Sequence, residues 1–257
     1  MLNTINNDMF YDTLDKSSLN ENISGIFLTH VDSKTGEILP KEYKHIYSNF
    51  DNETKLFKPL IFLDATQSIT KVKIDMTKNK YNAVFFSLHK IGGPLNMGVL
   101  VINAPKEKPF VPLIAGLQNE GLRGGTLNEE EFIKNRNIFR MSKHTIDERV
   151  ETWNEIKDYM KSKKINVVEP TQKHLYNTFL IKIPRKECPF KTINRLADKG
   201  IYIGTISACE GEKLFNDIMN GGSLNKTSNE DVLLRISFLK PNDINKNIID
   251  EIYEQIK

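Results

Sequence analysis

The apolar and polar positions of the chain form short runs of two kinds. Apolar runs of strand length are followed by clusters of Gly, Pro, Asp or Ser, and they occupy residues 24–30, 58–65, 82–88 and 97–104. Residues 40–50, which open with a proline, have the pattern of a helix. Strands that alternate with helical or loop crossovers predict an α/β fold with a mostly parallel sheet.

A charged helical stretch over residues 128–164 separates this first half from a second α/β unit. The second unit is expected to contain strands at 175–183, 201–207 and 231–238, helices at 190–200 and 210–220, and a terminal helix. We therefore predict a first domain over residues 1–135 and a smaller carboxyl-terminal domain over residues 136–257.

Composition excludes several classes of protein. The chain has 257 residues, and 36 Lys and Arg against 33 Asp and Glu leave a nearly balanced surface without a basic stripe, which argues against nucleic-acid binding. No secretory signal or apolar run of membrane-spanning length occurs in the sequence. The two cysteines, Cys188 and Cys209, are too few for a disulfide framework or a thiolate metal site. We expect a cytoplasmic protein without a bound metal.

Polar side chains follow two of the predicted strands. Asp64 and Gln67 come after the strand at 58–65, whereas Ser87, His89 and Lys90 come after the strand at 82–88. The spacing suits one crossover in a parallel sheet, which would place both clusters at the same edge. Two simpler interpretations stay open at this point, namely a solvated surface lysine and an aspartate that caps a turn.

This set of side chains suits pyridoxal phosphate. The cofactor requires a lysine for a Schiff base, a carboxylate that keeps its pyridine nitrogen protonated, and hydroxyl groups for its phosphate. All three types of group occur in the two clusters.

The segments "FLDATQSITKVKIDM" and "FFSLHKIGGPLNMGVLVI" closely resemble the cofactor core of the class V pyridoxal-phosphate enzymes, and specifically the NifS/IscS-type cysteine desulfurases. The resemblance implies a partial large domain of the fold type I transferases over residues 1–135. It makes Lys90 the Schiff-base lysine, Asp64 the partner of the pyridine nitrogen and Gln67 a donor to the ring hydroxyl. Ser87 and His89 become phosphate ligands.

Two further segments of the first half resemble the same family. "GLQNEGLRGGTLN" contains Thr126, which in the family reaches the cofactor phosphate of a neighbouring subunit and so implies a homodimer. "THVDSKTGEILP" has Ser33 where the desulfurases place an asparagine near the ring hydroxyl. Class V aminotransferases are similar to this chain in having a hydroxyl residue at that position.

The two cysteines of the second half differ in the sequence motif that surrounds them. "IYIGTISACEGEKLF" resembles the desulfurase loop whose cysteine accepts sulfur, and the matching residue is Cys209. A following helix would favour its thiolate, although Glu210 and Glu212 oppose this. A small buried side chain remains the alternative for Cys209. Cys188 has no motif around it and is interpreted as structural.

The strand "LLRISF" resembles the family strand whose arginine grips the substrate carboxylate, which points to Arg235. A planar bidentate clamp is a natural use of a cleft arginine, and an internal salt bridge is the alternative. Asn177, in "YNTFLI", matches a polar position near the start of the small domain and has no assigned role.

The resemblance implies a cysteine desulfurase that converts L-cysteine to alanine and leaves a persulfide on Cys209, from which a sulfur-acceptor protein would take it. The match begins partway through the family pattern, without its Gly-Thr phosphate turn and ring-stacking histidine, so we interpret the chain as an amino-terminally shortened relative. Two alternatives stay open: a catalytically impaired homologue that acts as a binding partner, and a class V aminotransferase or lyase with another amino-acid substrate.

Overall fold

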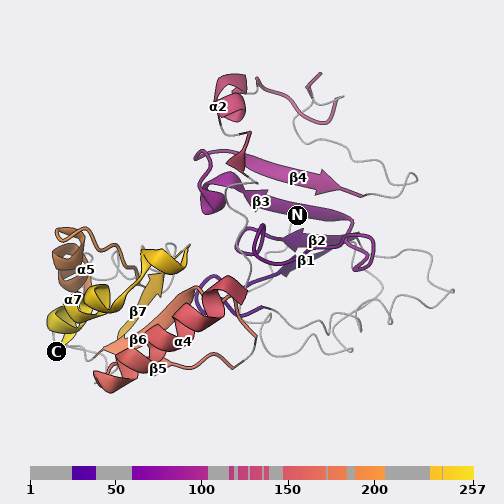
Figure 1. Cartoon of the computed structure of the whole chain (residues 1–257). Coiled ribbons are helices and arrows are strands. Elements are labelled where there is room, and N and C mark those ends of the chain that lie inside the picture. Colours follow the sequence, from indigo (N-terminus) through magenta and orange to yellow (C-terminus); the bar gives the residue numbers. More distant parts are fainter. Residues whose placement is uncertain are drawn as a thin grey trace, which may run out of the picture.

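A four-stranded sheet forms the first half of the molecule (Figure 1). The computed structural model describes residues 25–38, 60–103, 116–118, 121–126, 128–134, 136–138, 147–171, 173–183, 189–205, 232–238 and 240–257. The sheet order is β1-β2-β3-β4, with strands β1 (Gly25–Thr29), β2 (Leu60–Asp64), β3 (Ala83–Ser87) and β4 (Gly98–Ile102). β1, β2 and β3 are parallel and β4 is antiparallel to β3, which confirms the predicted mostly parallel sheet.

Alternation of side chains builds the core of this sheet. Ile26, Leu28, Ile61 and Leu63 point to one buried face, where they join a cluster from β3 and from the 3₁₀ turn η4 (Leu88–Ile91). On the opposite face the rings of Phe27 and Phe62 stack with centroids 4.6 Å apart, so a cross-strand aromatic pair also supports the parallel register.

The glycines after η4 are required by the path of the chain. Gly92 has φ 86°, in the left-handed region that glycine adopts without strain. A Cβ at Gly93 would lie 2.7 Å from Cδ1 of Ile138 and 2.9 Å from the carbonyl oxygen of Leu88. Together the two glycines allow the tight return to β4 and thereby hold Lys90 at the end of β3.

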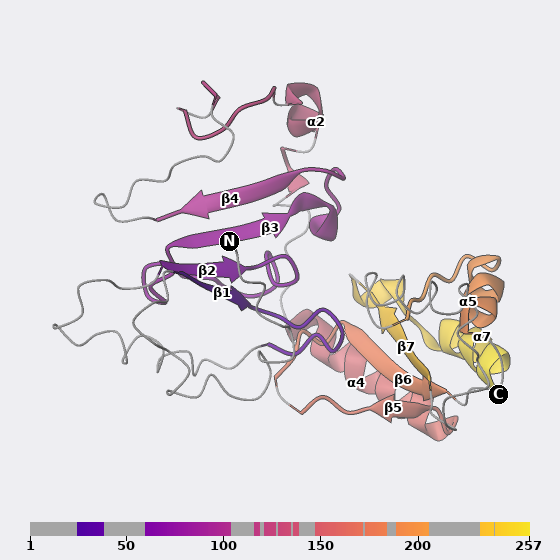
Figure 2. The ribbon, with the colours of Figure 1, turned by 180° about the vertical axis from the view of Figure 1, so that it is seen from behind.

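The second half is an antiparallel sheet packed against helices (Figure 2). Its order is β5-β6-β7, with strands β5 (Asn166–Val168), β6 (Thr178–Ile183) and β7 (Val232–Ser237). The helices are α4 (Asp147–Ser162), α5 (Pro189–Ala197) and α7 (Lys246–Ile256), and a 3₁₀ turn, η5 (Pro241–Asp243), precedes α7. A separate core fills the space between this sheet and the helices, with Trp153 stacked on Phe179 at 5.2 Å.

The described structure differs from the expected elements at residues 201–205 and at β5. The strand predicted at 201–207 is wrong for its described residues, because 201–205 make only one bridge, between Gly204 and Arg235. The described part of the predicted helical stretch 128–164 contains the helices α2 (Glu129–Lys134) and α4. β5 was not predicted, and the helices expected at 40–50 and 210–220 lie outside the described residues.

A short pairing joins the two halves. Ile38 donates its backbone N–H to the carbonyl of Lys173 at 2.7 Å, and Leu175 donates to the carbonyl of Gly36 at 2.9 Å. Arg149, fully buried on α4, donates from Nε to the carbonyl of Leu175 at 3.2 Å. These bonds hold the segment after β1 against the start of β6. The domain boundary at residue 135 stays a prediction.

Among the described residues, no helix combines the length and the apolar character needed to cross a bilayer.

Candidate functional site

A cleft of about 240 Å³ lies between the edge of the first sheet and the second half of the molecule. It is lined by residues from five separate segments, namely Val31, Asp32, Ser33, Gly36, Gln67, Lys71, Lys90, Leu175, Asn177, Thr178, Arg235, Ser237 and Phe238. Four of the residues singled out from the sequence therefore meet there with the unassigned Asn177: Ser33, Gln67, Lys90 and Arg235. The carboxyl ends of parallel strands are the usual location of ligands in α/β sheets, and this cleft has that location.

The two polar clusters lie at one sheet edge, as expected from their spacing. Because β2 and β3 are parallel, Asp64 at the end of β2 and Ser87 at the end of β3 lie at the same side of the sheet. Asp64 is half-buried, and its Oδ1 accepts a hydrogen bond from the backbone N–H of Thr66 at 2.8 Å. This turn fixes the carboxylate in place. Lys90 follows in η4 with an exposed side chain.

Arg235 reaches across the cleft from β7 to the segment after β1. Its Nη1 donates to the carbonyl oxygen of Ser33 at 2.8 Å. Burial lowers the pKa of Arg235, and the charge of Asp32 opposes that shift. Oδ1 of Asp32 also accepts from the backbone N–H groups of Lys34 and Thr35, at 2.8 and 2.7 Å. Asp32 thus shapes the loop that holds both Ser33 and the guanidinium.

The turn after β2 places Gln67 and Lys71 in the cleft. Nζ of Lys71 donates to the backbone carbonyl of Gln67 at 2.9 Å, and the Lys71 side chain is only 8% exposed. Burial, together with the nearby cations of Arg149 and Lys90, lowers the pKa of Lys71 to about 8. Thr70, just before it, has φ 65°.

A half-buried histidine just after β1 supports the same turn. Nδ1 of His30 and Oγ of Ser68 share a hydrogen bond of 2.8 Å, and Ser68 Oγ also donates to the carbonyl of Ala65 at 3.3 Å. Since a hydroxyl has one proton to donate, this arrangement has His30 Nδ1–H as the donor to Ser68. Burial lowers the pKa of His30, which favours this neutral form.

Several predicted residues are not among the described residues that line the cleft. Asp64, Ser87 and His89 lie at the same sheet edge but outside its lining, and Thr126 is exposed elsewhere. The thiol predicted to accept sulfur, Cys209, and the other cysteine, Cys188, both lie outside the described residues. The predicted roles of all these residues stay predictions.

Two lining residues, Asp32 and Lys71, were not singled out from the sequence. Asp32 sits beside Ser33 in a polar segment that reads as an ordinary turn. Lys71 is followed by Lys73 in "TKVKID", and nothing local distinguishes the buried lysine from the exposed one. The only available signal was the position of Lys71, four residues after Gln67 and so one turn away.

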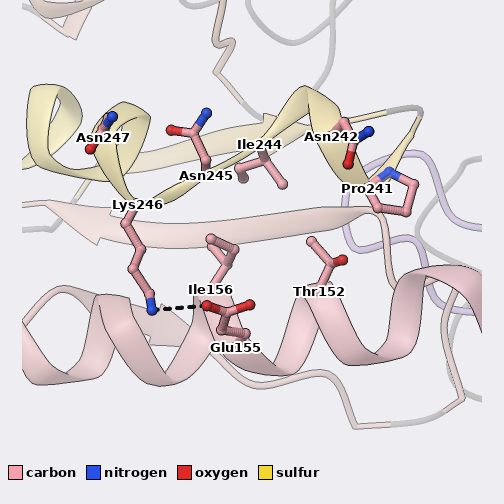
Figure 3. Close-up of a pocket in the computed structure, with 9 residues that line it drawn as sticks. All are labelled: Thr152, Glu155, Ile156, Pro241, Asn242, Ile244, Asn245, Lys246 and Asn247. Atoms are coloured by element: carbon pink, nitrogen blue, oxygen red, sulfur yellow. Dashed lines mark ion pairs between the residues drawn. The ribbon is translucent and has the colours of Figure 1, made fainter.

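A larger hollow, of about 590 Å³, lies between α4 and the segment that leads into α7 (Figure 3). Its lining consists of Thr152, Glu155, Ile156, Pro241, Asn242, Ile244, Asn245, Lys246 and Asn247. Lys246 is paired with Glu155 at 2.8 Å, and the Asn245 side chain caps α7 through the N–H of Ile248. Because the two charged residues of this hollow pair with each other, the smaller cleft with its excess of cations is the better candidate for chemistry.

Comparisons with known proteins find similar sequences and similar folds. Residues 4–120 match the family model described as aminotransferase class-V. Cysteine desulfurase IscS of Photorhabdus laumondii is 33% identical over 108 residues, which are 37% of this chain and 26% of that protein. Cysteine desulfurase IscS of Ruthia magnifica is 27% identical over 155 residues, which are 60% of this chain and 37% of that protein. The chain thus matches well under half the length of these relatives.

Solved structures show the same fold over most of the chain. A NifS-like protein has a TM-score of 0.64 at 21% identity, and the match covers 94% of this chain and 62% of the NifS-like chain. A NifS-like protein from Rickettsia africae has a TM-score of 0.62 at 18% identity, and the match covers 89% of this chain and 59% of the Rickettsia chain. This likeness confirms the predicted partial fold type I architecture. Residues 4–120 are thus similar in sequence to the class V aminotransferases, and the fold is similar to that of NifS-like proteins.

Proposed function

We propose that this protein is a pyridoxal-phosphate-dependent cysteine desulfurase. The main support is that one cleft contains Lys90 and Gln67 from the sheet edge together with Arg235 from β7. An amine, an amide and a guanidinium that face each other can hold a carbonyl cofactor on one side and an amino-acid carboxylate on the other. Relatives of the NifS/IscS type are named as cysteine desulfurases, which supports the choice of substrate.

The cleft suits an anionic aldehyde. Lys90 offers an exposed primary amine, and the charged residues of the lining are Lys71, Lys90 and Arg235 against Asp32. This excess of positive charge favours a ligand that carries phosphate or carboxylate groups over a neutral one. Pyridoxal phosphate, when bound, supplies an electron-withdrawing ring conjugated to the substrate.

Each residue of the chain has a separate task in this proposal. Nζ of Lys90 would hold the cofactor and would move the proton of the substrate α-carbon. The Asp64 carboxylate, held by the N–H of Thr66, keeps a proton on the ring nitrogen. Arg235 binds the substrate carboxylate after its contact with the Ser33 carbonyl is exchanged.

Cys209 is proposed to accept the sulfur. Its thiolate attacks the sulfur of L-cysteine, an S–S bond forms, and the substrate C–S bond breaks with its electron pair left on carbon. A proton then completes alanine, so L-cysteine and the Cys209 thiol give L-alanine and a Cys209 persulfide. The proposal includes a homodimer in which Thr126 contacts the cofactor phosphate of the partner, a cytoplasmic location and a sulfur-acceptor protein.

Borohydride reduction with pyridoxal phosphate, followed by peptide mass mapping, tests the assignment of Lys90. We expect the phosphopyridoxyl group on Lys90, and its absence from the exposed Lys73 serves as an internal control. Labelling of Lys71 in place of Lys90 would contradict the assignment. Cofactor bound at Lys90 without sulfide release from cysteine would favour a catalytically impaired relative, and turnover of another amino acid would favour an aminotransferase or lyase.

A further inference from the structure

Lys71 is a buried amine with no acidic partner in the part of the chain that the structure describes. Its one hydrogen bond is to the backbone carbonyl of Gln67, at 2.9 Å. The charged groups that act on it are Lys90 in η4 and Arg149 on α4, and both are cations. A protonated amine has three donors, so two N–H bonds of Lys71 are left for another acceptor.

Among the residues that the structure describes, the cleft around Lys71 has more positive than negative charge. Asp32 is the one carboxylate in the described part of its lining, and it accepts hydrogen bonds from its own loop and acts on Arg235. The buried Lys71, the half-buried Arg235 and the exposed Lys90 therefore line a space in which the described cations outnumber the anions. Buried charges are normally paired, so an anion from the ligand is the natural counter-charge for this site.

The position of Lys71 indicates which anion that is. It shares the cleft with Arg235, Asn177 and Ser33, whereas Ser87 and His89, the proposed phosphate ligands, are outside the described lining. The group that reaches Lys71 is thus on the Arg235 side of the site. For an amino-acid substrate this group is the carboxylate.

We propose that Lys71 is a substrate-binding residue that pairs, together with Arg235, with the carboxylate group of the ligand in this cleft. The inference rests on the proposed function only for the identity of that ligand as cysteine. Lys71 then selects for amino acids with a free carboxylate, and the Gln67 carbonyl keeps its amine in place when no ligand is bound.

The affinity for a simple carboxylate tests this proposal without any cofactor chemistry. The probe is 3-mercaptopropionate, which lacks the amine of cysteine and cannot form a Schiff base, and its neutral control is 3-mercaptopropionamide. Binding to the full chain is measured by ligand-observed NMR titration. Charged hydrogen bonds of this kind predict that Lys71→Met weakens binding of the carboxylate by roughly tenfold to a hundredfold. Lys73→Met, at an exposed lysine, should have no effect.

The pH profile separates a contact with the ligand from a structural role. Since the pKa of Lys71 is about 8, wild-type affinity for the carboxylate should fall about tenfold from pH 7 to pH 9 as the amine loses its proton. Lys71→Met should bind with a flat profile over this range. The wild-type profile needs no variant, so it is informative even if the variant fails to fold.

Three results would overturn the proposal. They are no binding of 3-mercaptopropionate to the wild type at millimolar concentration, equal affinity for the amide, and a pH profile that is the same in wild type and Lys71→Met. None of these depends on Lys90 or on sulfur transfer. The two tests are therefore independent: labelling of Lys90 with pyridoxal phosphate can succeed while the proposal for Lys71 fails, and labelling can fail while that proposal succeeds.

Discussion

A protonated amine buried as deeply as that of Lys71 destabilises the fold that contains it. The difference between the folded-state pKa of Lys71 and its unfolded-state value near 10.5 measures this loss of folding free energy. Proteins tolerate such groups mainly at sites where the charge has a use, which is consistent with the position of Lys71 in the cleft.

Lys71→Met should therefore stabilise the protein at neutral pH. The folded-state pKa is below the unfolded one, so the unfolded state binds more protons and the wild type gains stability as pH rises from 8 toward 10.5. The shift predicts a gain on the order of 3 kcal/mol for the variant at pH 7, and a smaller gain at pH 9.5. Urea unfolding of both proteins at the two pH values measures it. A gain that does not change with pH would show that the charge is not the cause.

Asp64→Asn should impair turnover far more than occupancy by the cofactor. An amide keeps the turn hydrogen bond to the N–H of Thr66 but cannot keep a proton on a pyridine nitrogen. We expect a turnover loss of roughly 100-fold or more, while borohydride labelling of Lys90 stays near the wild-type level. Equal turnover in both proteins would exclude the proposed role. Asp75→Asn, in a surface turn, is the matched control.

At the scale of elements, the turn after β2 presents Gln67 to the cleft and closes in a strained conformation. Its backbone bonds from Ser68 and Ile69 to the carbonyl of Ala65 continue the strand directly into the segment that presents Gln67. It then closes through Thr70 at φ 65°, a conformation that is strained for a β-branched residue. The hydroxyl of Thr70 is also buried without a hydrogen-bond partner in the described structure.

Thr70→Gly should stabilise the protein by about 1 kcal/mol. Glycine removes the left-handed strain and the unsatisfied hydroxyl. Together these two gains in stability exceed the free-energy cost of the larger conformational entropy of glycine in the unfolded chain. Thr77→Gly is the control, because Thr77 is exposed in a turn without positive φ and should lose stability or stay unchanged. Thermal unfolding of the three proteins measures the difference. A loss of stability in Thr70→Gly would mean that the Thr70 side chain contributes contacts that outweigh the strain.

For the whole molecule, sequence patterns were most informative where local chemistry determines the structure. β2, β3 and the sheet-edge placement of Asp64 and Lys90 were predictable, because apolar runs end in polar clusters and parallel strands align their carboxyl ends. The strand expected at 201–207 was not found, because its apolar residues Ile201 and Ile203 pack on the second core without a continuous partner strand. An apolar run predicts burial, but it does not by itself predict hydrogen-bonded pairing with a neighbouring strand.

The cleft itself was less predictable than its individual members. It forms because residues 36–38 pair with 173–175, more than a hundred positions away, and no local pattern indicates that contact. Burial of Lys71 follows from this packing and from α4, which brings Arg149 close. Family resemblance supplied Arg235 as a substrate residue, while the loop contact with Ser33 became visible only in the structure.

Sulfur transfer by the whole protein should depend on Cys209 and not on Cys188. Only Cys209 stands in a Ser-Ala-Cys segment of the family type, so only its thiolate is expected to attack the substrate sulfur. Cys209→Ala should abolish sulfide release from cysteine and leave borohydride labelling of Lys90 intact, whereas Cys188→Ala should change neither. Sulfide release and persulfide-specific alkylation with mass mapping measure both. If the wild type labels at Lys90 but releases no sulfide, the impaired-relative alternative is favoured, and a persulfide found on Cys188 alone would contradict both interpretations.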